Sequence, residues 1–130
     1  MSENKGYHAH IYYDAETKPK ATALRAALIE TFKVEPGAFS DPPIGPHPVS
    51  QFNVMFETPE FQNVVPWLML HRDGLDVLVH PLTDSSYNDH TDYAMWLGSP
   101  VALKTDTLRH APVGDHLLPS AQRAPAAAAE

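Results

Sequence analysis

The 130-residue chain has a net charge of −7 and no cysteine, and these two features exclude several classes of function. Without cysteine there are no disulfides, zinc-thiolate sites, iron–sulfur ligands or thiol nucleophiles, so any bound metal must use imidazole, carboxylate or water. An acidic surface argues against nucleic acid or an anionic membrane as a partner, and no apolar run approaches the roughly 20 residues of a membrane span.

The remaining composition is typical of one soluble domain. With 43% hydrophobic and 19% charged residues, the chain can bury a single core. We expect residues 1–105 to form this domain and residues 106–130 to form a C-terminal extension that is partly disordered. The short polar start shows no signal-peptide pattern, so we expect a cytoplasmic protein. Eight histidines point toward metal binding or proton transfer.

The first predicted element is a strand over residues 7–13, Tyr-His-Ala-His-Ile-Tyr-Tyr. Side chains alternate between the faces of a strand, so His8, His10 and Tyr12 share one face. Ala9 and Ile11 lie on the other face, which suits a core. The two imidazoles are about 7 Å apart along the strand, a spacing that lets both reach one ion.

A helix and a stiff loop follow. Thr17 and Pro19 are typical of a helix start, and apolar residues then recur every three or four positions up to Phe32. A short irregular strand is expected over residues 38–43. Glycine and prolines in Gly45-Pro46-His47-Pro48 predict a tight connection that holds His47 rigidly.

The second half repeats the pattern. Residues 49–57 alternate as a strand, a helix is expected from Thr58 to Gly74, and residues 75–80 read as another strand. We also expect a short helix from Thr91 through Leu97 and an edge strand over residues 101–103. From about Leu117 the composition predicts a disordered tail without chemistry, so His110 and His116 are given no role.

The order strand, helix, strand, strand, helix, strand predicts an α+β protein with a ferredoxin-like βαββαβ sandwich and a C-terminal extension. The first strand would lie between the third and fourth, antiparallel to both, with both helices on one face. The opposite face would then gather His8, His10, Glu57 and His80. That face would be left uncovered in a monomer, so we expect a homodimer.

Six short motifs, spread over about residues 6–103, resemble the DOPA 4,5-dioxygenase family. They are Tyr7-His8-Ala9-His10-Ile11-Tyr12-Tyr13, Gly45-Pro46-His47-Pro48, Val65-Pro66-Trp67-Leu68, Leu78-Val79-His80-Pro81, Asp89-His90-Thr91 and Trp96-Leu97-Gly98. The resemblance implies a dimeric ferredoxin-like fold and cleavage of a catechol ring by non-haem iron(II) with O2. One departure is that Thr83 is followed by Asp84, where the family usually has glycine.

On this hypothesis each candidate residue takes a role. His10 and His80, then His8, would bind Fe(II). Glu57 belongs to none of the family motifs and is a further candidate ligand only because the expected sheet places it on the same face. His47 or His90 would take a proton from the catechol, L-DOPA or a related dihydroxyphenyl compound, and later return it. The side chains that would contact the aromatic substrate are Tyr12 and Trp96.

Several alternatives stay open at this point. His8 and His10 could lie on a solvated face, or be buried and hydrogen-bonded at a dimer interface. His47 could simply lock its loop, and His90 could belong to a helix cap. The protein could also be an enzyme that acts on an aromatic compound without metal, or a non-catalytic binder of metal, such as zinc, or of small aromatics.

Overall fold

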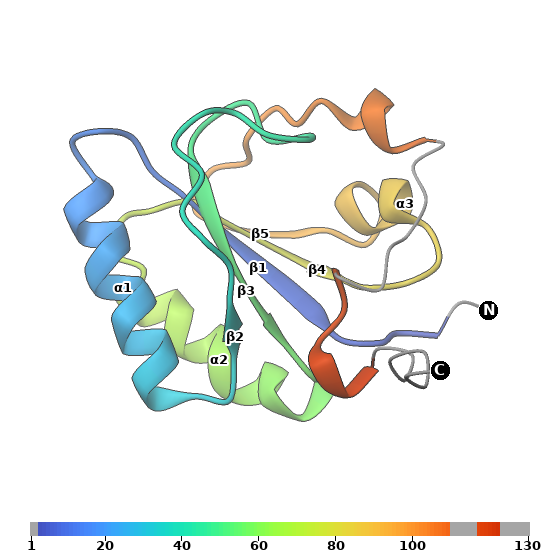
Figure 1. Ribbon diagram of the computed structural model, residues 1–130, viewed down its shortest axis with the longest axis horizontal. Coiled ribbons are helices and arrows are strands. Elements are labelled where there is room, and N and C mark those ends of the chain that lie inside the picture. Colours follow the sequence, from blue (N-terminus) through green and yellow to red (C-terminus); the bar gives the residue numbers. More distant parts are fainter. Residues whose placement is uncertain (1–2, 110–116, 123–130) are drawn as a thin grey trace, which may run out of the picture.

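A five-stranded antiparallel sheet with helices on both sides forms the fold of the computed structural model, which describes residues 3–109 and 117–122 (Figure 1). The strands are β1 (Tyr7–Tyr12), β2 (Glu35–Pro36), β3 (Gln51–Phe56), β4 (Val77–Pro81) and β5 (Met95–Leu97). The helices are α1 (Lys18–Thr31), α2 (Thr58–His71) and α3 (Ser86–His90), followed by 3₁₀ turns over Thr105–Leu108 and Ser120–Gln122. The chain is therefore an α+β protein.

The sheet has the strand order β2-β3-β1-β4-β5, with β1 antiparallel to both β3 and β4. The predicted position of the first strand between the third and fourth is confirmed. His8 lies opposite His80 on β4, and His10 lies opposite Asn53 on β3 and Leu78 on β4. This register places imidazoles from two neighbouring strands on one face of the sheet.

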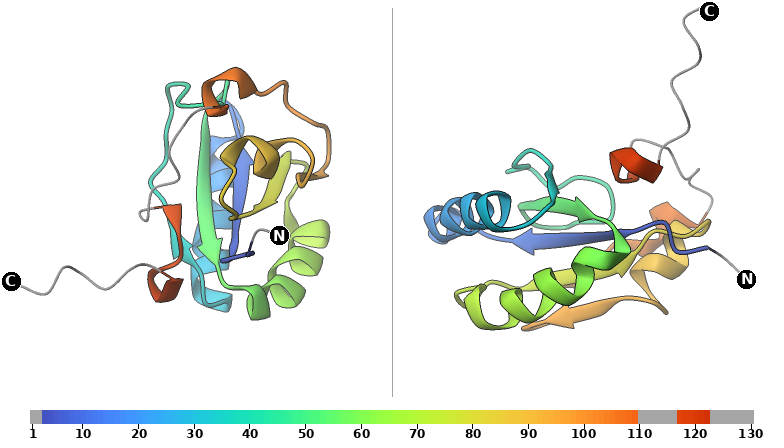
Figure 2. Two further views of the ribbon diagram at one scale, coloured as in Figure 1. Left: turned by 90° about the vertical axis from the view of Figure 1, so that its right-hand side faces the viewer. Right: turned by 90° about the horizontal axis from the view of Figure 1, so that it is seen from below.

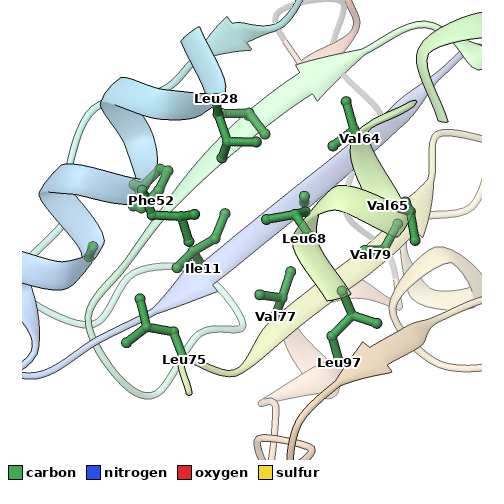
Figure 3. Close-up of a cluster of buried hydrophobic side chains, with 14 of the residues drawn as sticks. Ile11, Leu28, Phe52, Val64, Val65, Leu68, Leu75, Val77, Val79 and Leu97 are labelled. Atoms are coloured by element: carbon green, nitrogen blue, oxygen red, sulfur yellow. The ribbon is translucent and has the colours of Figure 1, made fainter. Parts of the chain in front are cut away.

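The hydrophobic core lies on the face of the sheet that carries Ile11, and α1 and α2 both pack there (Figure 3). Leu28 from α1 and Leu68 from α2 have no solvent exposure, and neither has Ile11 or Phe52 from the strands beneath them. The alternation predicted for the strands is confirmed. One face of the sheet packs against the helices, so the opposite face is available for functional side chains.

Truncation of the core should measure how much this packing stabilises the fold. Ile11→Ala removes a fully buried side chain, and such changes cost about 2–5 kcal/mol because a cavity remains. Leu70→Ala, at a side chain that is 83% exposed, should change the free energy of unfolding by less than about 0.5 kcal/mol. Urea denaturation monitored by circular dichroism tests both values. Equal effects of the two substitutions would contradict the assignment of this face as the core.

The histidine face of the sheet is covered by elements from the second half of the chain. α3 and the Thr105–Leu108 turn lie over it, on the side away from α1 and α2 (Figures 1 and 2). Leu117 reaches the same region, and its neighbour Leu118 is buried. The face expected to be open is thus partly closed within one chain.

The second strand differs from the prediction. It is formed by Glu35 and Pro36, which pair with Met55 and Val54, and not by residues 38–43. Only Ser40 in that range makes a bridge, to Gln51. Pro42 and Pro43 have no N–H to donate to a ladder, whereas Pro36 lies on an edge strand, where proline is tolerated.

The segment after β4 was also predicted wrongly. α3 spans Ser86–His90, and the Ser85 hydroxyl accepts a hydrogen bond from the Asn88 N–H at 3.2 Å at its start. Residues 95–97, predicted to be helical, form β5, in which Trp96 pairs with Leu78. The outer edge of β4 was free for pairing, and this tertiary contact outweighs local helix propensity.

One further expectation, the edge strand over residues 101–103, differs from the structure. Residues 101–103 form no strand, and the Lys104 N–H donates instead to the Pro46 carbonyl at 2.8 Å. Residues 117–122 belong to the C-terminal extension and include the Ser120–Gln122 turn. His110 and His116 lie outside the described residues. Across residues 3–109 and 117–122, no helix is both long and apolar enough to cross a membrane.

Candidate metal centre

Three histidines from the two central strands meet on the covered face of the sheet. His8, His10 and His80 have exposed fractions of 5%, 6% and 2%, and each offers a ring nitrogen within 4.8 Å of the others. The interpretation of His8 and His10 as solvated surface residues is therefore wrong. The register explains the convergence, because His8 and His80 are direct partners across β1 and β4.

Hydrogen bonds to oxygen acceptors fix which nitrogen of His10 and His80 carries the proton. His10 donates from Nδ1 to the Gln51 Oε1 at 2.9 Å, and His80 donates from Nδ1 to the Pro81 carbonyl at 2.8 Å. Carbonyl oxygens can only accept, so each Nδ1 must carry the hydrogen. In the neutral rings the Nε2 atoms then carry lone pairs. These two Nε2 atoms face each other at 3.1 Å.

This arrangement fits a metal ion. Two facing lone pairs repel each other unless a cation lies between them, and two nitrogen ligands at about 2.1 Å and about 90° apart are separated by about 3.0 Å. Burial, reinforced by the neighbouring histidines, lowers the pKa of His10 and of His80 well below 6.5. Both rings are therefore neutral at pH 7, which is the form that binds metals.

His8 completes the group from the edge of the cluster. Its Nε2 lies 2.6 Å from the Leu117 carbonyl oxygen, to which it must donate. An ion held by His8 would therefore take the Nδ1 atom or displace the Leu117 carbonyl. The C-terminal extension, predicted to carry no chemistry, thus contacts the candidate ligands.

A second group shares His10 with the first. His10, His47 and His90 also offer nitrogens within 4.8 Å of one another. His47 is held by the stiff loop, where its main-chain N–H donates to the Ile44 carbonyl at 3.0 Å. The Tyr12 hydroxyl lies 2.8 Å from His47 Nδ1, and burial raises the pKa of Tyr12, so the phenol keeps its proton and can either donate to Nδ1 or accept from it. In the tautomer in which Tyr12 donates, neutral His47 carries its hydrogen on Nε2.

The tautomer of His90 is fixed by an oxygen acceptor. Its Nδ1 donates to the Ser86 carbonyl at 2.7 Å within α3, so its Nε2 carries a lone pair. The adjacent Asp89 is 2% exposed and accepts from the Thr83 hydroxyl at 2.6 Å and the Thr83 N–H at 3.0 Å. These bonds tie α3 to the end of β4. His90 is therefore held firmly beside His80, with ring centroids 4.1 Å apart.

A cavity of about 240 Å³ lies between the sheet, the loop that carries His47 (residues 45–48) and α3. It is lined by five histidines: His8, His10, His47, His80 and His90. Apolar groups from the loops contribute the rest of the wall, together with a few polar side chains. The lining residues other than the histidines are Ile44, Gly45, Pro46, Gln51, Asn53, Leu82, Ser86, Asp89, Leu108 and Leu117. Such a cavity is large enough for a single aromatic ring with small substituents.

The other predicted site residues lie outside this cavity. Glu57 accepts a hydrogen bond from the Gln122 amide at 3.0 Å and belongs to neither histidine group. Tyr12 contacts His47, and Trp96 stacks on Tyr12 with ring centroids 5.9 Å apart. Neither aromatic side chain is among the cavity-lining residues, so both are placed to support His47.

Sequence reasoning missed two residues of the site, Gln51 and Asp89. Both are buried and both line the cavity. The signal for Gln51 was its place on the polar face of a strand, directly opposite Tyr12. Asp89 belongs to the Asp89-His90-Thr91 motif but was given no role, because its contacts with Thr83 depend on the α3 turn, which was not predicted.

Comparison with known proteins agrees with the histidine pattern. The family model described as the Dopa 4,5-dioxygenase family matches residues 7–107, which include all five histidines of the cavity. The chain belongs to the Dopa 4,5-dioxygenase family. Its members supply the context for the cavity described above.

Two relatives of the chain come from Botryotinia fuckeliana and Amanita muscaria. An uncharacterised 21.2 kDa protein of Botryotinia fuckeliana is 35% identical over 109 residues, or 75% of this chain and 60% of that protein. The DOPA 4,5-dioxygenase of Amanita muscaria is 32% identical over 118 residues, or 82% of this chain and 51% of that protein. The chain therefore spans between half and two thirds of the length of these relatives.

A solved bacterial structure has the same fold. The crystal structure of a proposed dioxygenase from Nostoc punctiforme superposes with a TM-score of 0.81 at 46% identity. The match covers 82% of this chain and 92% of that one. The shared fold therefore covers nearly the whole of the bacterial chain.

The metal-free form of this Dopa 4,5-dioxygenase family member should lose stability as the pH falls below 6.5. Burial lowers the pKa of His47 to about 4, whereas the unfolded chain takes up a proton near 6.5. Between these two pKa values the unfolded state binds more protons than the folded state. The free energy of unfolding therefore decreases as the pH decreases, by up to about 1.4 kcal/mol per pH unit for each such histidine. Urea denaturation from pH 8 to pH 5 measures this slope.

Comparison with His47→Asn isolates the contribution of one imidazole to that slope. The substitution removes a group whose pKa is lowered on folding, so the slope between pH 7 and pH 5 should become shallower. A free energy of unfolding that stays constant over this range in the unsubstituted protein would contradict the lowered pKa values.

Proposed function

We propose that the protein is a non-haem iron(II) extradiol dioxygenase that opens the ring of a catechol with O2. The observation that supports this most strongly is the pair of His10 and His80 Nε2 lone pairs, 3.1 Å apart, at a buried cavity. Membership of the Dopa 4,5-dioxygenase family and the name of the Amanita muscaria relative agree with it. L-DOPA or a related dihydroxyphenyl compound is the proposed substrate.

His10 and His80 would hold the iron, with His8 as the third ligand. When bound, iron(II) supplies a Lewis-acidic, redox-active centre with open positions for the two catechol oxygens and for O2. Glu57 is left out of this ligand set because its carboxylate is hydrogen-bonded to Gln122, away from the cavity.

The two remaining histidines take different parts in proton transfer. His90 presents a lone pair on Nε2, so it is the group that accepts a proton from a catechol hydroxyl. Burial lowers the pKa of His90, which keeps it neutral and able to accept at pH 7. In the tautomer in which Tyr12 donates to Nδ1, His47 would donate from Nε2 to an oxygen on which negative charge develops.

The walls of the cavity orient the ring and exclude water. Leu82, Leu108 and Leu117 supply apolar surface around the histidines. Removal of water strengthens the hydrogen bonds that His47 and His90 make to the substrate. Tyr12 and Trp96 would act through His47, which they hold in place, rather than by contact with the substrate.

The architecture suits this proposal. The order β2-β3-β1-β4, with α1 and α2 on one face, supports the proposed ferredoxin-like unit, to which β5 would add an edge strand. A homodimer remains a prediction, although its first reason is weaker because α3 and Leu117 already cover part of the histidine face. Light scattering of the purified protein gives the oligomeric state directly.

One experiment tests the proposed reaction. Protein purified without oxygen is analysed for metal, loaded with iron(II), and mixed with L-DOPA or caffeate in the presence and absence of O2. The proposal predicts a yellow semialdehyde product that requires both iron and O2. Turnover that persists in chelator would favour the metal-free alternative. Metal bound without turnover of any catechol would favour a non-catalytic binder, and either outcome overturns the proposal.

A further inference from the structure

We propose that Gln51 is a positioning residue for the metal ligand His10. This inference rests on the proposed function and adds a residue to it. Gln51 begins β3, directly opposite Tyr12 on β1, and its side chain is 6% exposed on the histidine face. Its Oε1 accepts the Nδ1–H of His10 at 2.9 Å.

The contact determines which atom His10 offers to an ion. A neutral imidazole carries one hydrogen, and an acceptor beside Nδ1 holds it there. Nε2 of His10 is then left with its lone pair, aimed at Nε2 of His80 at 3.1 Å. If the Gln51 oxygen is removed, the hydrogen gains by moving to Nε2, where it can donate to His80. That shift would block the ligand atom.

The partner ligand is held differently. His80 Nδ1 donates to the main-chain carbonyl of Pro81, which no side-chain substitution can remove. Of the two facing rings, His10 is therefore the one whose tautomer depends on a replaceable side chain. Gln51 also lines the cavity, so a substitution there acts directly beside the proposed metal site.

Substitutions at Gln51 separate positioning from simple packing. Gln51→Met keeps the approximate length and removes the acceptor, so the affinity for a metal should fall about 10- to 100-fold, as is usual for a lost ligand partner. Gln51→Glu keeps an acceptor oxygen and adds negative charge, so affinity should match or exceed that of the unsubstituted protein. A purely structural role would make the buried charge of Gln51→Glu the more damaging change.

The test uses Zn²⁺ as the probe, because it binds nitrogen sites at least as tightly as Fe²⁺ and is diamagnetic. Competition with a chromogenic chelator gives the affinity, and ¹⁵N NMR of the histidine rings gives the tautomer. The Zn²⁺-loaded protein should show a protected Nδ1–H on His10, which is lost to exchange in Gln51→Met. Gln62→Met, at an exposed position on α2, is the matched control and should change neither quantity.

The outcomes distinguish this inference from the proposed function. Tight Zn²⁺ binding that is unchanged in Gln51→Met, or a His10 ring without Nδ1–H, overturns the role of Gln51 and leaves the metal site standing. Failure of the unsubstituted protein to bind Zn²⁺ overturns both. If Gln51→Met does not fold, Gln51→Glu decides, since weaker binding than in the unsubstituted protein contradicts the inference.

Discussion

Replacement of His10 by asparagine is expected to abolish both metal binding and ring cleavage. His10 is the one residue common to the two histidine groups, and its Nε2 lies 3.1 Å from that of His80. The loss of metal affinity should exceed the 10- to 100-fold effect that is typical when only a partner of a ligand is removed. Metal analysis after dialysis, together with the initial rate on a catechol, measures the two losses.

His71→Asn is the matched control for this substitution. His71 is exposed in the last turn of α2, where its Nδ1 lies 2.8 Å from the Trp67 carbonyl, remote from the cavity. This variant should keep its metal and its rate. Circular dichroism of His10→Asn checks that the fold survives. A folded His10→Asn protein with full metal content would contradict the assignment of His10 as a ligand.

His90→Asn should separate proton transfer from metal binding. Because His90 offers an Nε2 lone pair from α3 and is assigned to the substrate, its loss should lower kcat by about 10²- to 10⁴-fold while the metal content stays the same. His8→Asn, on the other side of His80, should instead reduce the metal content. Rapid mixing of the loaded variants with a catechol and O2 gives kcat.

The same pair of variants tells the two histidine groups apart. If His90→Asn loses the metal and His8→Asn keeps it, the ion is held by His10, His47 and His90, and the roles proposed for His8 and His90 are wrong. In both sets the ring nitrogens lie within 4.8 Å of one another. The facing lone pairs of His10 and His80 favour His8, His10 and His80 as the ligands.

The sheet and its two main helices could be predicted from local patterns. Alternation in residues 7–12 and 51–56 fixed which side chains face the core, and Thr17 with Pro19 marked the start of α1. The errors lie in segments whose secondary structure is determined by pairing with another strand. Trp96 and its neighbours were predicted to be helical but form β5, because the edge of β4 was available, a contact that no local window contains.

The site could be predicted where strand alternation alone determines it. His8, His10 and His80 share a face through the register of β1 and β4, and the structure brings their nitrogens together. Gln51 and Asp89 were missed because their roles depend on side-chain contacts and loop paths. Glu57 was included on the same alternation, but it directly precedes α2, and its side chain meets Gln122 instead.

Anomalous diffraction from a crystal of the iron-loaded protein, grown without oxygen, is the most direct test of the metal centre. The structure predicts one iron peak between the Nε2 atoms of His10 and His80, within about 2.2 Å of each, with His8 as the third ligand. An iron peak that contacts His47 and His90 but not His80, or no peak at the cavity at full iron occupancy in solution, would contradict it.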